Sequence, residues 1–449
     1  MATNIAGQFT ADIEAFLAKE TLPLARRQLV AYQFGDPEVL PKGRGTTFTA
    51  TRYNRVPLPF APLSEGVPPV GQTMTISQQT VTVQQWGDKI TLTDVAEMTI
   101  KHPVMNEAKK LIALQVAETL ERNTFTAFLG FTQVNYVNSR GARGSLQAGD
   151  VLNTFEITRA FAQLVTLGAP RFMGDELTNT KLDADAGGAR VSDNPRQRPH
   201  YTAIIHPFME ADVAQNSTFV LAASYSDVNK LYNYEIGQWH SVRFCSSNMV
   251  PYWTGVANTG ITWTPGTSGS LATGTYYSIV TASDTQNQYE SRIYAVSAAQ
   301  AVTGPNGSLS VTLPVLAGYT FNIYIGTTTS PTNLGLSASG PSVGPLTGQA
   351  VQIAGGQTVV ITGTGIAQTP PAAPAANITV YPCYLFGRGA YGQVVLDDIK
   401  ITWLDKADKS DPVNQLRVVG WKNFYGTLIK NNTFAMRIEG TSAFSSTFG

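Results

Sequence analysis

The sequence predicts an α+β protein that is interrupted in its second half by an all-β domain. Helical and strand-like periodicities both occur before residue 254. The 122 residues from Gly255 to Ala376 then carry only three charged side chains, Asp284, Glu290 and Arg292. The more charged composition returns after this segment, which indicates an insertion into a host fold and not a tandem domain.

The bulk composition is typical of a globular protein with little net charge. The chain has 449 residues, of which 43% are hydrophobic and 14% are charged. A length in this range favours roughly two to four domains. Basic and acidic residues both number 31, whereas a dedicated nucleic-acid binder would show a basic excess. Weak mutual repulsion is acceptable for a subunit that assembles with copies of itself.

Cysteine usage and the N-terminal residues lead us to expect folding in a reducing cytoplasm. The two cysteines, Cys245 and Cys383, are too few for a disulfide scaffold or a zinc site, and we expect both to be buried. The first residues lack the basic and apolar regions of a signal peptide. No apolar run approaches about 18 residues, so no membrane partner is expected.

The N-terminal region predicts a helix followed by a long hairpin. Residues 9–32 have helical spacing, with a kink or break at Pro23 and a turn at Phe34-Gly35-Asp36-Pro37. Residues 46–57 and 73–83 alternate as strands around a tip rich in proline and glycine. These strands have too few large apolar residues to form a core, so the hairpin is either disordered or laid across a neighbouring subunit, which we favour.

Residues 104–129 show the clearest helical pattern in the chain. Apolar residues gather on one side and charged residues on the other: Met105, Ile112, Val116, Leu120 and Ala127 against Glu107, Lys110, Glu118, Glu121 and Arg122. Weaker patterns predict a helix at 155–167, a loop at 171–200, a strand at 201–205, a helix at 208–213 and a strand at 239–244.

The low-charge segment predicts a β-sandwich, because short strand patterns recur in it between turn residues. The predicted strands are 275–281, 291–297, 308–313, 319–326 and 358–362. A proline- and alanine-rich linker at 369–376 ends the segment. Beyond it we predict strands at 394–396 and 399–403, then a hairpin of 426–430 and 433–438 around a tight Asn431-Asn432 turn.

Catalytic and ligand-binding motifs are absent, so we predict no enzyme, no cofactor and no catalytic, cofactor-binding or metal residue. The four histidines are scattered, and His206 before Pro207 favours a capping or core role. The string Asp183–Gly188 begins like a calcium loop but has Asn194 where the bidentate carboxylate belongs. The remaining candidates favour solvated positions: Arg190, Arg196, Arg198, Asp397 and Asp398.

An ordered series of short strings resembles the major capsid family of the N-four-like tailed phages. The strings are Leu29–Asp36, Trp86–Thr99, Ala117–Leu120, Ala148–Asp150, Ile204–Pro207, Asn233–Trp239, Phe386–Gly392, Asp411–Gln415 and Val419–Lys422. Each string is weak alone, but their order and spacing are specific. The resemblance covers nearly all of 1–253 and 378–440.

This resemblance implies the Hong-Kong-phage capsid fold, with the insertion as a departure from the family pattern. The implied domains are an N-arm at 1–45, an E-loop hairpin and return at 46–95, a P-domain with spine helix at 96–150, an A-domain at 151–253, an inserted immunoglobulin-like sandwich at 254–377 and C-terminal P-domain strands at 378–449.

The implied function is that of a structural major capsid protein, assembled in the host cytoplasm into an icosahedral virion head around double-stranded DNA. The implied partners are copies of itself in hexamers and pentamers, portal and scaffold proteins, weakly and non-specifically held DNA, and a cement protein or host surface glycan at 255–376. Three alternatives stay open: an encapsulin-like compartment, a surface adhesin or glycan-binding protein acting through 255–376, and a hydrolase with an accessory β-domain.

Overall fold

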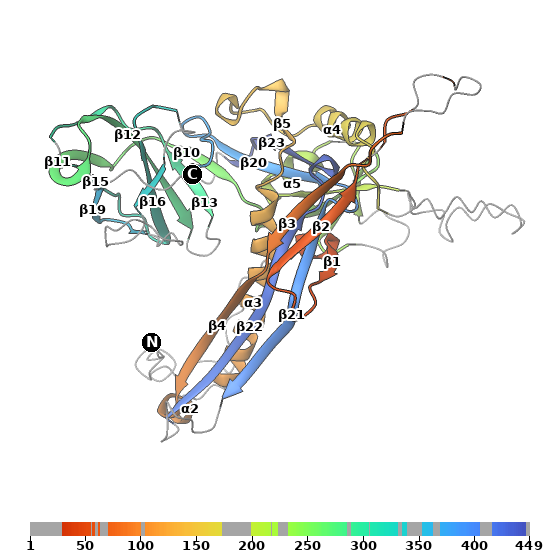
Figure 1. Cartoon of the computed structure of the whole chain (residues 1–449), viewed down its shortest axis with the longest axis horizontal. Helices are drawn as coiled ribbons and strands as arrows, with labels where there is room; N and C mark the ends of the chain where they lie inside the picture. The colour runs from red at the N-terminus through yellow and green to blue at the C-terminus, as the bar shows by residue number, and fades with distance from the viewer. Residues whose placement is uncertain are drawn as a thin grey trace, which may run out of the picture. The chain divides into compact units, whose positions relative to one another are not determined.

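A computed structural model describes most of the chain between residues 29 and 445. The described residues are 29–54, 56–58, 62, 71–99, 104–172, 199–216, 218–222, 232–284, 289–304, 306–330, 335–338, 353–361, 369–404 and 415–445. Their contacts form two compact units: Met1–Gly130 with Arg388–Asn432, and Phe131–Gly387 with Thr433–Gly449. Helices and strands occur in both units, in agreement with the α+β prediction (Figure 1).

The body of unit 1 is a four-stranded sheet covered by one long helix (Figure 1). The strands follow the order β1 (Asp36–Val39), β21 (Tyr391–Leu404), β22 (Leu416–Ile429) and β4 (Gln84–Thr93), and helix α2 (Asp94–Thr99) follows β4. Helix α3 (Val104–Phe128) confirms the predicted helix at 104–129. Its side chains Ile112, Val116 and Leu120 form a core with Leu92 and Trp421.

The strands predicted at 394–396 and 399–403 are one continuous strand, so that prediction was wrong about the break. β21 pairs with β22 along its whole length, with register shifts between Val395 and Asp397 and between Asp397 and Lys400. Such irregularities disturb the two-residue alternation from which strands are read, although the hydrogen-bonded ladder resumes beyond them.

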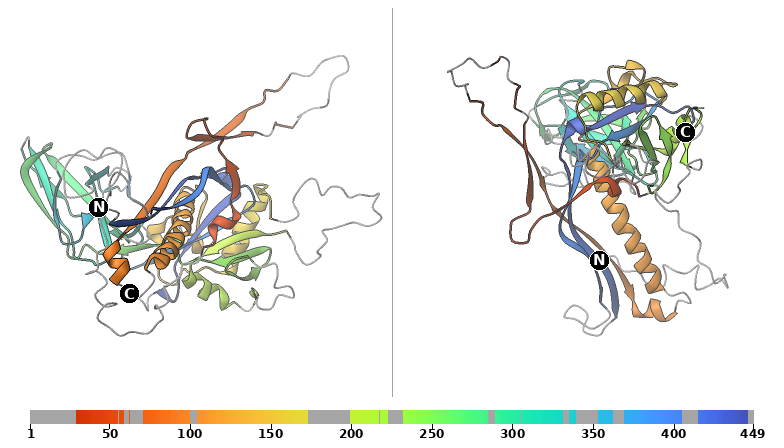
Figure 2. Two further views of the ribbon diagram at one scale, coloured as in Figure 1. Left: turned by 90° about the horizontal axis from the view of Figure 1, so that it is seen from below. Right: turned by 90° about the vertical axis from the view of Figure 1, so that its right-hand side faces the viewer.

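The predicted N-terminal hairpin is confirmed as a sheet of two strands only. β2 (Thr47–Tyr53) and β3 (Ile76–Thr82) pair antiparallel from Thr47 opposite Thr82 to Tyr53 opposite Ile76. Figure 2 shows this pair, in the red-orange part of the chain, as a narrow ribbon that leaves the body of unit 1.

Most of the helix predicted at 9–32 lies outside the described residues. Ala31–Phe34 is a short 3-10 helix, η2, and Asp36–Val39 is strand β1 where we predicted a turn. The turn prediction was wrong here because β1 finds a parallel partner in Gly392–Val395, more than 350 residues further along the chain.

Unit 2 contains a long sheet with helices packed on its host part. The host elements are β5 (Val134–Tyr136), η3 (Val137–Ser139), η4 (Arg143–Ser145), α4 (Thr154–Thr166), β6 (Tyr201–Ile205), α5 (Pro207–Ala214), β7 (Val220–Leu221), β8 (Glu235–Trp239), β9 (Val242–Ser246), β10 (Trp253–Val256), β20 (Thr379–Phe386) and β23 (Ala435–Gly440). The strands at one end follow the order β10, β20, β6, β9, β8, β7. The predictions at 155–167, 201–205 and 208–213 are confirmed.

Two predictions in this part of the chain were wrong. The strand at 239–244 is split between β8 and β9, because His240 has a left-handed φ of 55° and reverses the chain. The hairpin around Asn431-Asn432 does not form: β22 pairs with β21 and β4, whereas β23 pairs with β20 and β5. The 3-10 helix η10 (Asn432–Phe434) carries the chain from one sheet to the other.

The insertion contains two sheets that share one core, which is a β-sandwich arrangement. Its strands are β11 (Thr262–Leu271), β12 (Gly274–Asp284), β13 (Glu290–Tyr294), β14 (Gln300–Val302), β15 (Gly307–Thr312), β16 (Tyr319–Gly326), β17 (Gly335–Ala338), β18 (Ile353–Ala354) and β19 (Thr358–Ile361). β11, β15 and β19 form one sheet; β12, β13, β16, β17 and β18 continue the sheet of β10. Buried side chains from both sheets, such as Val311 and Phe321, belong to the same apolar cluster.

The two contact units divide the predicted C-terminal segment 378–449. Its strands β21 and β22 belong to unit 1, whereas β20 and β23 pair with each other in unit 2. Residues 131–150, which we predicted with the spine helix, also lie in unit 2. The chain therefore crosses between the units three times, which a linear division into domains cannot express.

Candidate assembly surface and anchoring sites

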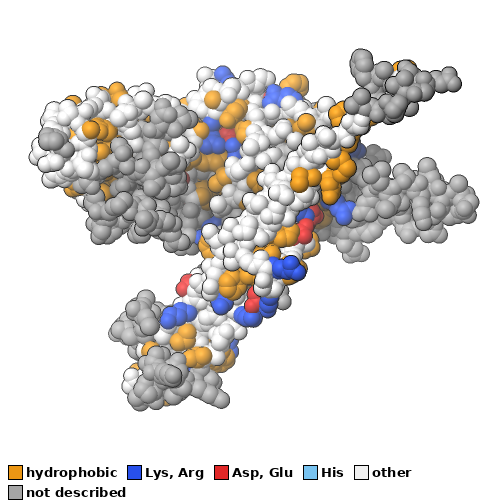
Figure 3. All heavy atoms as spheres, in the orientation of Figure 1, with side chains coloured by type: hydrophobic (Ala, Val, Ile, Leu, Met, Phe, Trp, Pro, Cys, Tyr) orange, Lys and Arg blue, Asp and Glu red, His pale blue; other side chains and the backbone are white. Residues whose placement is uncertain are grey.

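The outer half of the β2–β3 hairpin exposes large apolar side chains. Tyr53 and Ile76 face each other across the two strands and are 69% and 53% exposed, and Met74 is 70% exposed. Val56 and Leu58 add to this group. The space-filling view in Figure 3 also shows apolar side chains, in orange, along this hairpin. We call Tyr53, Met74 and Ile76 the hairpin patch.

The root of the hairpin is packed firmly, in contrast to the hairpin patch. Val83 is buried with Val394 and Leu428 of the main sheet, and Phe48 and Val81 pack against this cluster. The backbone N–H of Val83 donates to the carbonyl of Thr46 at 2.8 Å, which closes the hairpin at its base. The hairpin is therefore an arm that is anchored at one end and uncovered at the other.

A buried carboxylate holds the segment that precedes the hairpin. Glu121 of α3 is fully buried and accepts hydrogen bonds from the backbone N–H groups of Val30 (2.7 Å), Ala31 (2.6 Å) and Tyr32 (3.0 Å). These are the first N–H groups of η2, which has no side-chain cap of its own. Burial raises the pKa of Glu121, and the three N–H donors act in the opposite direction.

The carbonyl side of the same segment is held by two more side chains. The Tyr391 hydroxyl donates to the carbonyl of Ala31 at 2.5 Å, and the Gln393 amide donates to that of Tyr32 at 2.6 Å. We call Glu121, Tyr391 and Gln393 the root clamp. The sequence pattern placed Glu121 on the charged side of α3, and the structure shows that its side chain is buried there. Its wheel position opposite the apolar side of α3 gave no sign that a distant segment would cover it.

A second buried ionic group lies in unit 2, where the insertion leaves the host. Arg143 binds Glu439 through Nε–H···Oε2 and Nη2–H···Oε1, both 2.7 Å, and the two side chains are 5% and 0% exposed. Arg143 Nη1 also donates to the carbonyl of Ala372 in the linker at 2.8 Å. The guanidinium carbon lies 3.6 Å from the ring centroid of Trp253, the first residue of β10.

The predicted candidate residues fall into separate environments. His200 contacts the Tyr232 hydroxyl at 3.1 Å, and His240 packs edge-on against Phe161. Hydrogen bonds from Lys400 and Lys42 lower the pKa of the half-buried Asp397 to about 2. Outside the described residues lie His102, Asp183–Gly188, Asn194, Arg190, Arg196 and Arg198, and the side chain of Asp398 is also undescribed.

His206 is a buried helix cap, as predicted. Its Nδ1 accepts a hydrogen bond from the backbone N–H of Phe208 at 3.3 Å, at the start of α5. Its ring packs against Tyr381 with centroids 4.7 Å apart. Burial lowers the pKa of His206 to about 4, so the ring is neutral near pH 7.

Both cysteines are buried and free, in agreement with the prediction. Burial raises the pKa of Cys383 to about 12 and that of Cys245 still further. These thiols are therefore protonated at neutral pH and poorly reactive in the folded chain.

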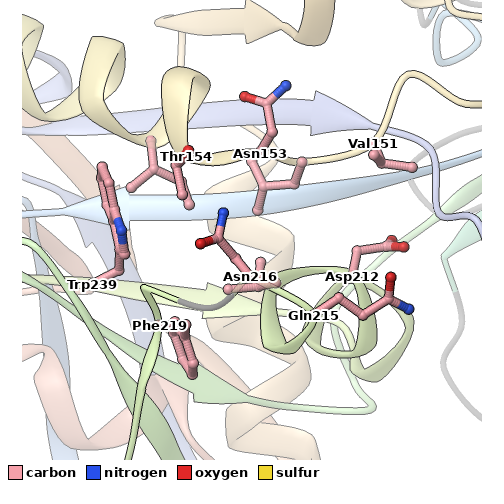
Figure 4. Close-up of a pocket in the computed structure, with 11 residues that line it drawn as sticks. Val151, Asn153, Thr154, Asp212, Gln215, Asn216, Phe219 and Trp239 are labelled. Atoms are coloured by element: carbon pink, nitrogen blue, oxygen red, sulfur yellow. The ribbon is translucent and has the colours of Figure 1, made fainter.

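One pocket of about 230 Å³ lies in unit 2 beside α4 and α5 (Figure 4). Trp239 lies at one end of it and Asp212 at the other, with Asn216 between them. Neighbouring groups already engage two of these side chains: Trp239 Nε1 donates to Thr218 Oγ1 at 2.9 Å, and Asn216 accepts from the Thr218 N–H at 3.0 Å. The described side chains that line the pocket include no histidine, cysteine or lysine that could act as a nucleophile or base.

The described residues hold no candidate for two other kinds of site. Within the ranges above, no three histidine, cysteine or acidic side chains gather as a metal site would require. No helix in the described part of the chain has the length and apolar character to cross a membrane.

The comparisons with known proteins found similarity in structure but none in sequence. No family model and no curated protein matches the chain. The chain is similar to the capsid of cyanophage P-SCSP1u with a TM-score of 0.48 and 10% identity, over 95% of this chain and 93% of that one. It is similar to the capsid of Ralstonia phage GP4 with a TM-score of 0.49 and 9% identity, over 96% of this chain and 95% of that one. It is also similar to the capsid asymmetric unit of cyanophage Pam1 with a TM-score of 0.49 and 10% identity, over 97% of this chain and 98% of that one.

Proposed function

We propose that the chain is a phage major capsid protein, a structural and non-enzymatic subunit that assembles with copies of itself into the icosahedral head of the virion. The observation that carries this proposal is the β2–β3 hairpin, anchored at its root and uncovered at its apolar outer half. The root clamp supports it further, because it fixes the chain segment from which the hairpin starts.

The energetics of the hairpin favour a second copy of the chain as its partner. A two-stranded hairpin is marginally stable in water unless one face is covered. Full burial of the hairpin patch stabilises by about 1.5–3 kcal/mol for each side chain. Contacts of this modest strength are sufficient in a closed shell, because every subunit is engaged several times.

The elements take the following roles in this proposal. The segment before β2 is the base of the N-arm, the β2–β3 hairpin is the E-loop, and α3 with β4, β21 and β22 is the P-domain with its spine helix. The sheet around β6 with α4 and α5 is the A-domain. Among phage capsid proteins, we assign the chain to the N-four-like family. In this assignment the insertion is an immunoglobulin-like domain that decorates the outside of the head.

The proposed partners follow from the same assignment. Copies of the chain form hexamers and pentamers, portal and scaffold proteins take part in assembly, and packaged double-stranded DNA contacts the inner face weakly, as a zero net charge favours. The insertion is the proposed contact for a cement protein or a host surface glycan. On the face shown in Figure 3 the described side chains of the insertion are almost all uncharged, which favours a neutral partner.

Electron microscopy of the expressed chain, with and without scaffold protein, tests the proposal. The triple variant Tyr53→Ser, Met74→Ser, Ile76→Ser removes the hairpin patch, and Val315→Ser, at a side chain that is 86% exposed in the insertion, is the matched control. We expect shells from the wild type and the control, and folded but unassembled subunits from the triple variant. Shells of normal yield from the triple variant, or no shells from the wild type, contradict the proposal.

The composition of purified particles separates this function from the encapsulin-like alternative. Particles from a phage-producing culture should contain double-stranded DNA, whereas an encapsulin-like compartment contains protein cargo. Nuclease-resistant DNA recovered after washing therefore supports the capsid function.

A further inference from the structure

The insertion is joined to the host by a shared β-strand as well as by its covalent connections. β10 pairs antiparallel with the host strand β20, with Trp253 opposite Val380 and Thr254 opposite Thr379. The same strand pairs in parallel with β13 of the insertion, from Thr254 opposite Arg292 to Val256 opposite Tyr294. The hydrogen-bonded sheet therefore runs without interruption from the host into the sandwich.

The two chain segments that connect the insertion to the host, which we call its entry and exit passages, also contact each other. Gly255 on the way in forms a bridge with Ala376 on the way out, and the Asn377 N–H donates to the Gly255 carbonyl at 2.8 Å. A Cβ atom at Gly255 would lie 2.2 Å from the Ala375 carbonyl oxygen and 2.7 Å from that of Pro374. Only glycine permits this approach, so the exit segment is packed against β10 and is not a free linker.

One host side chain contacts both passages. The Arg143 guanidinium holds the exit through the Ala372 carbonyl and the entry through the ring of Trp253, while Glu439 fixes it by two hydrogen bonds. Arg437 also approaches this carboxylate, with its Nε 2.8 Å from Glu439 Oε1. A planar guanidinium can satisfy these directions at once, whereas an ammonium group cannot.

The charges of this junction come from the host. Asp284, Glu290 and Arg292 are the only charged residues of the insertion, and the buried ion pair uses none of them. The host thus supplies the charged group that contacts both passages.

We propose that Arg143 is a positioning residue that fixes the orientation of the inserted sandwich on the host, so that the sandwich is a rigid extension of the host sheet. This inference does not depend on shell formation. If the capsid function holds, every copy presents its sandwich at one angle. Deletion of 256–375 then removes the partner strand of β10 and the partner carbonyl of Arg143, in addition to the sandwich surface.

Hydrogen exchange on the full-length chain tests the proposal, with Arg143→Met as the variant. Arg140→Met is the matched control, because Arg140 pairs with Asp150 at 2.9 Å in the same unit and none of its hydrogen bonds reaches the linker. In Arg143→Met we expect peptides that cover 253–256 and 369–378 to exchange at least about ten-fold faster. Peptides that cover the sandwich strands β12 and β16 should keep their wild-type rates in both variants.

Two further variants keep the test decisive. Arg143→Lys retains the charge but loses the fork, so we expect an intermediate rate at the junction. Gly255→Val separates the two passages by another route and should raise exchange in the same peptides. Wild-type rates at the junction in Arg143→Met and Gly255→Val would overturn the proposal. Uniform loss of protection across unit 2 in Arg143→Met would also overturn it, since the residue would then serve overall stability.

Discussion

Replacement of Glu121 by alanine is the most direct test of the root clamp. The variant deletes the acceptor of three backbone N–H groups at the start of η2, and the alanine side chain supplies no substitute. Val30 and Ala31 are fully buried, so water cannot reach their N–H groups without a local opening. The perturbation therefore acts on the attachment of the N-terminal segment to α3, and leaves the apolar core of α3 in place.

The expected loss of stability follows from the bonds that are broken. A buried donor left without a partner costs about 1–3 kcal/mol, and the N–H groups of Val30 and Ala31 are both of this kind. Tyr32 is partly buried and contributes less. The variant also avoids the cost of burying an ionised carboxylate, which offsets part of the loss. We expect a net decrease of about 3 kcal/mol in the free energy of unfolding of unit 1.

Urea denaturation and limited digestion with chymotrypsin measure this effect. Digestion should cut after Tyr32 and Phe34 in Glu121→Ala much faster than in the wild type, because the released segment exposes these bonds. Glu107→Ala on the same helix is the control. Its exposed pair with Lys110 is worth at most about 1 kcal/mol. A decrease below about 1 kcal/mol for Glu121→Ala, with unchanged cleavage, would refute the reasoning.

Three other predictions concern stability and reactivity. His206 has a pKa of about 4 in the folded chain and 6.5 as its ordinary value. Between pH 6.5 and about 4 the unfolded chain therefore binds a proton on His206 that the folded chain does not bind. The free energy of unfolding should fall by up to about 3 kcal/mol as the pH is lowered through this range. His206→Asn keeps a cap acceptor and should flatten the dependence, whereas an unchanged pH profile would contradict the assignment. A thiol reagent such as Ellman's should label Cys245 and Cys383 only after denaturant is added; rapid labelling of the native chain would show that they are accessible. Ile112→Ala should destabilise by about 2–5 kcal/mol, whereas Leu111→Ala, at a neighbouring side chain that is 47% exposed, should stay within about 0.5 kcal/mol. Equal effects in thermal unfolding would contradict the packing of α3.

Part of the candidate site could be predicted from the sequence. The alternation of residues 46–57 and 73–83 with few large apolar residues indicated a hairpin without a core, and the structure has it in this form. The scarcity of charges from Gly255 to Ala376 marked the insertion, and its two sheets share a core. The helical period of 104–129 identified Ile112, Val116 and Leu120 as buried residues of α3, but it missed Ala108, Phe125 and Phe128. Glu121 and Arg143 were not predicted, because their partners lie about 90 and 300 residues away.

The sequence by itself determined the elements whose signal is local: the period of α3, the alternation of β2 and β3, and the composition of the insertion. Only the tertiary structure decided which strands pair, since pairing depends on partners far along the chain. For this reason β21 is one strand with irregular register, and β23 pairs with β20 instead of forming a hairpin with β22. The same applies to buried charge. A glutamate or arginine is solvated by default, and it becomes an anchor only where the fold brings donors or acceptors to it, as at Glu121 and Arg143.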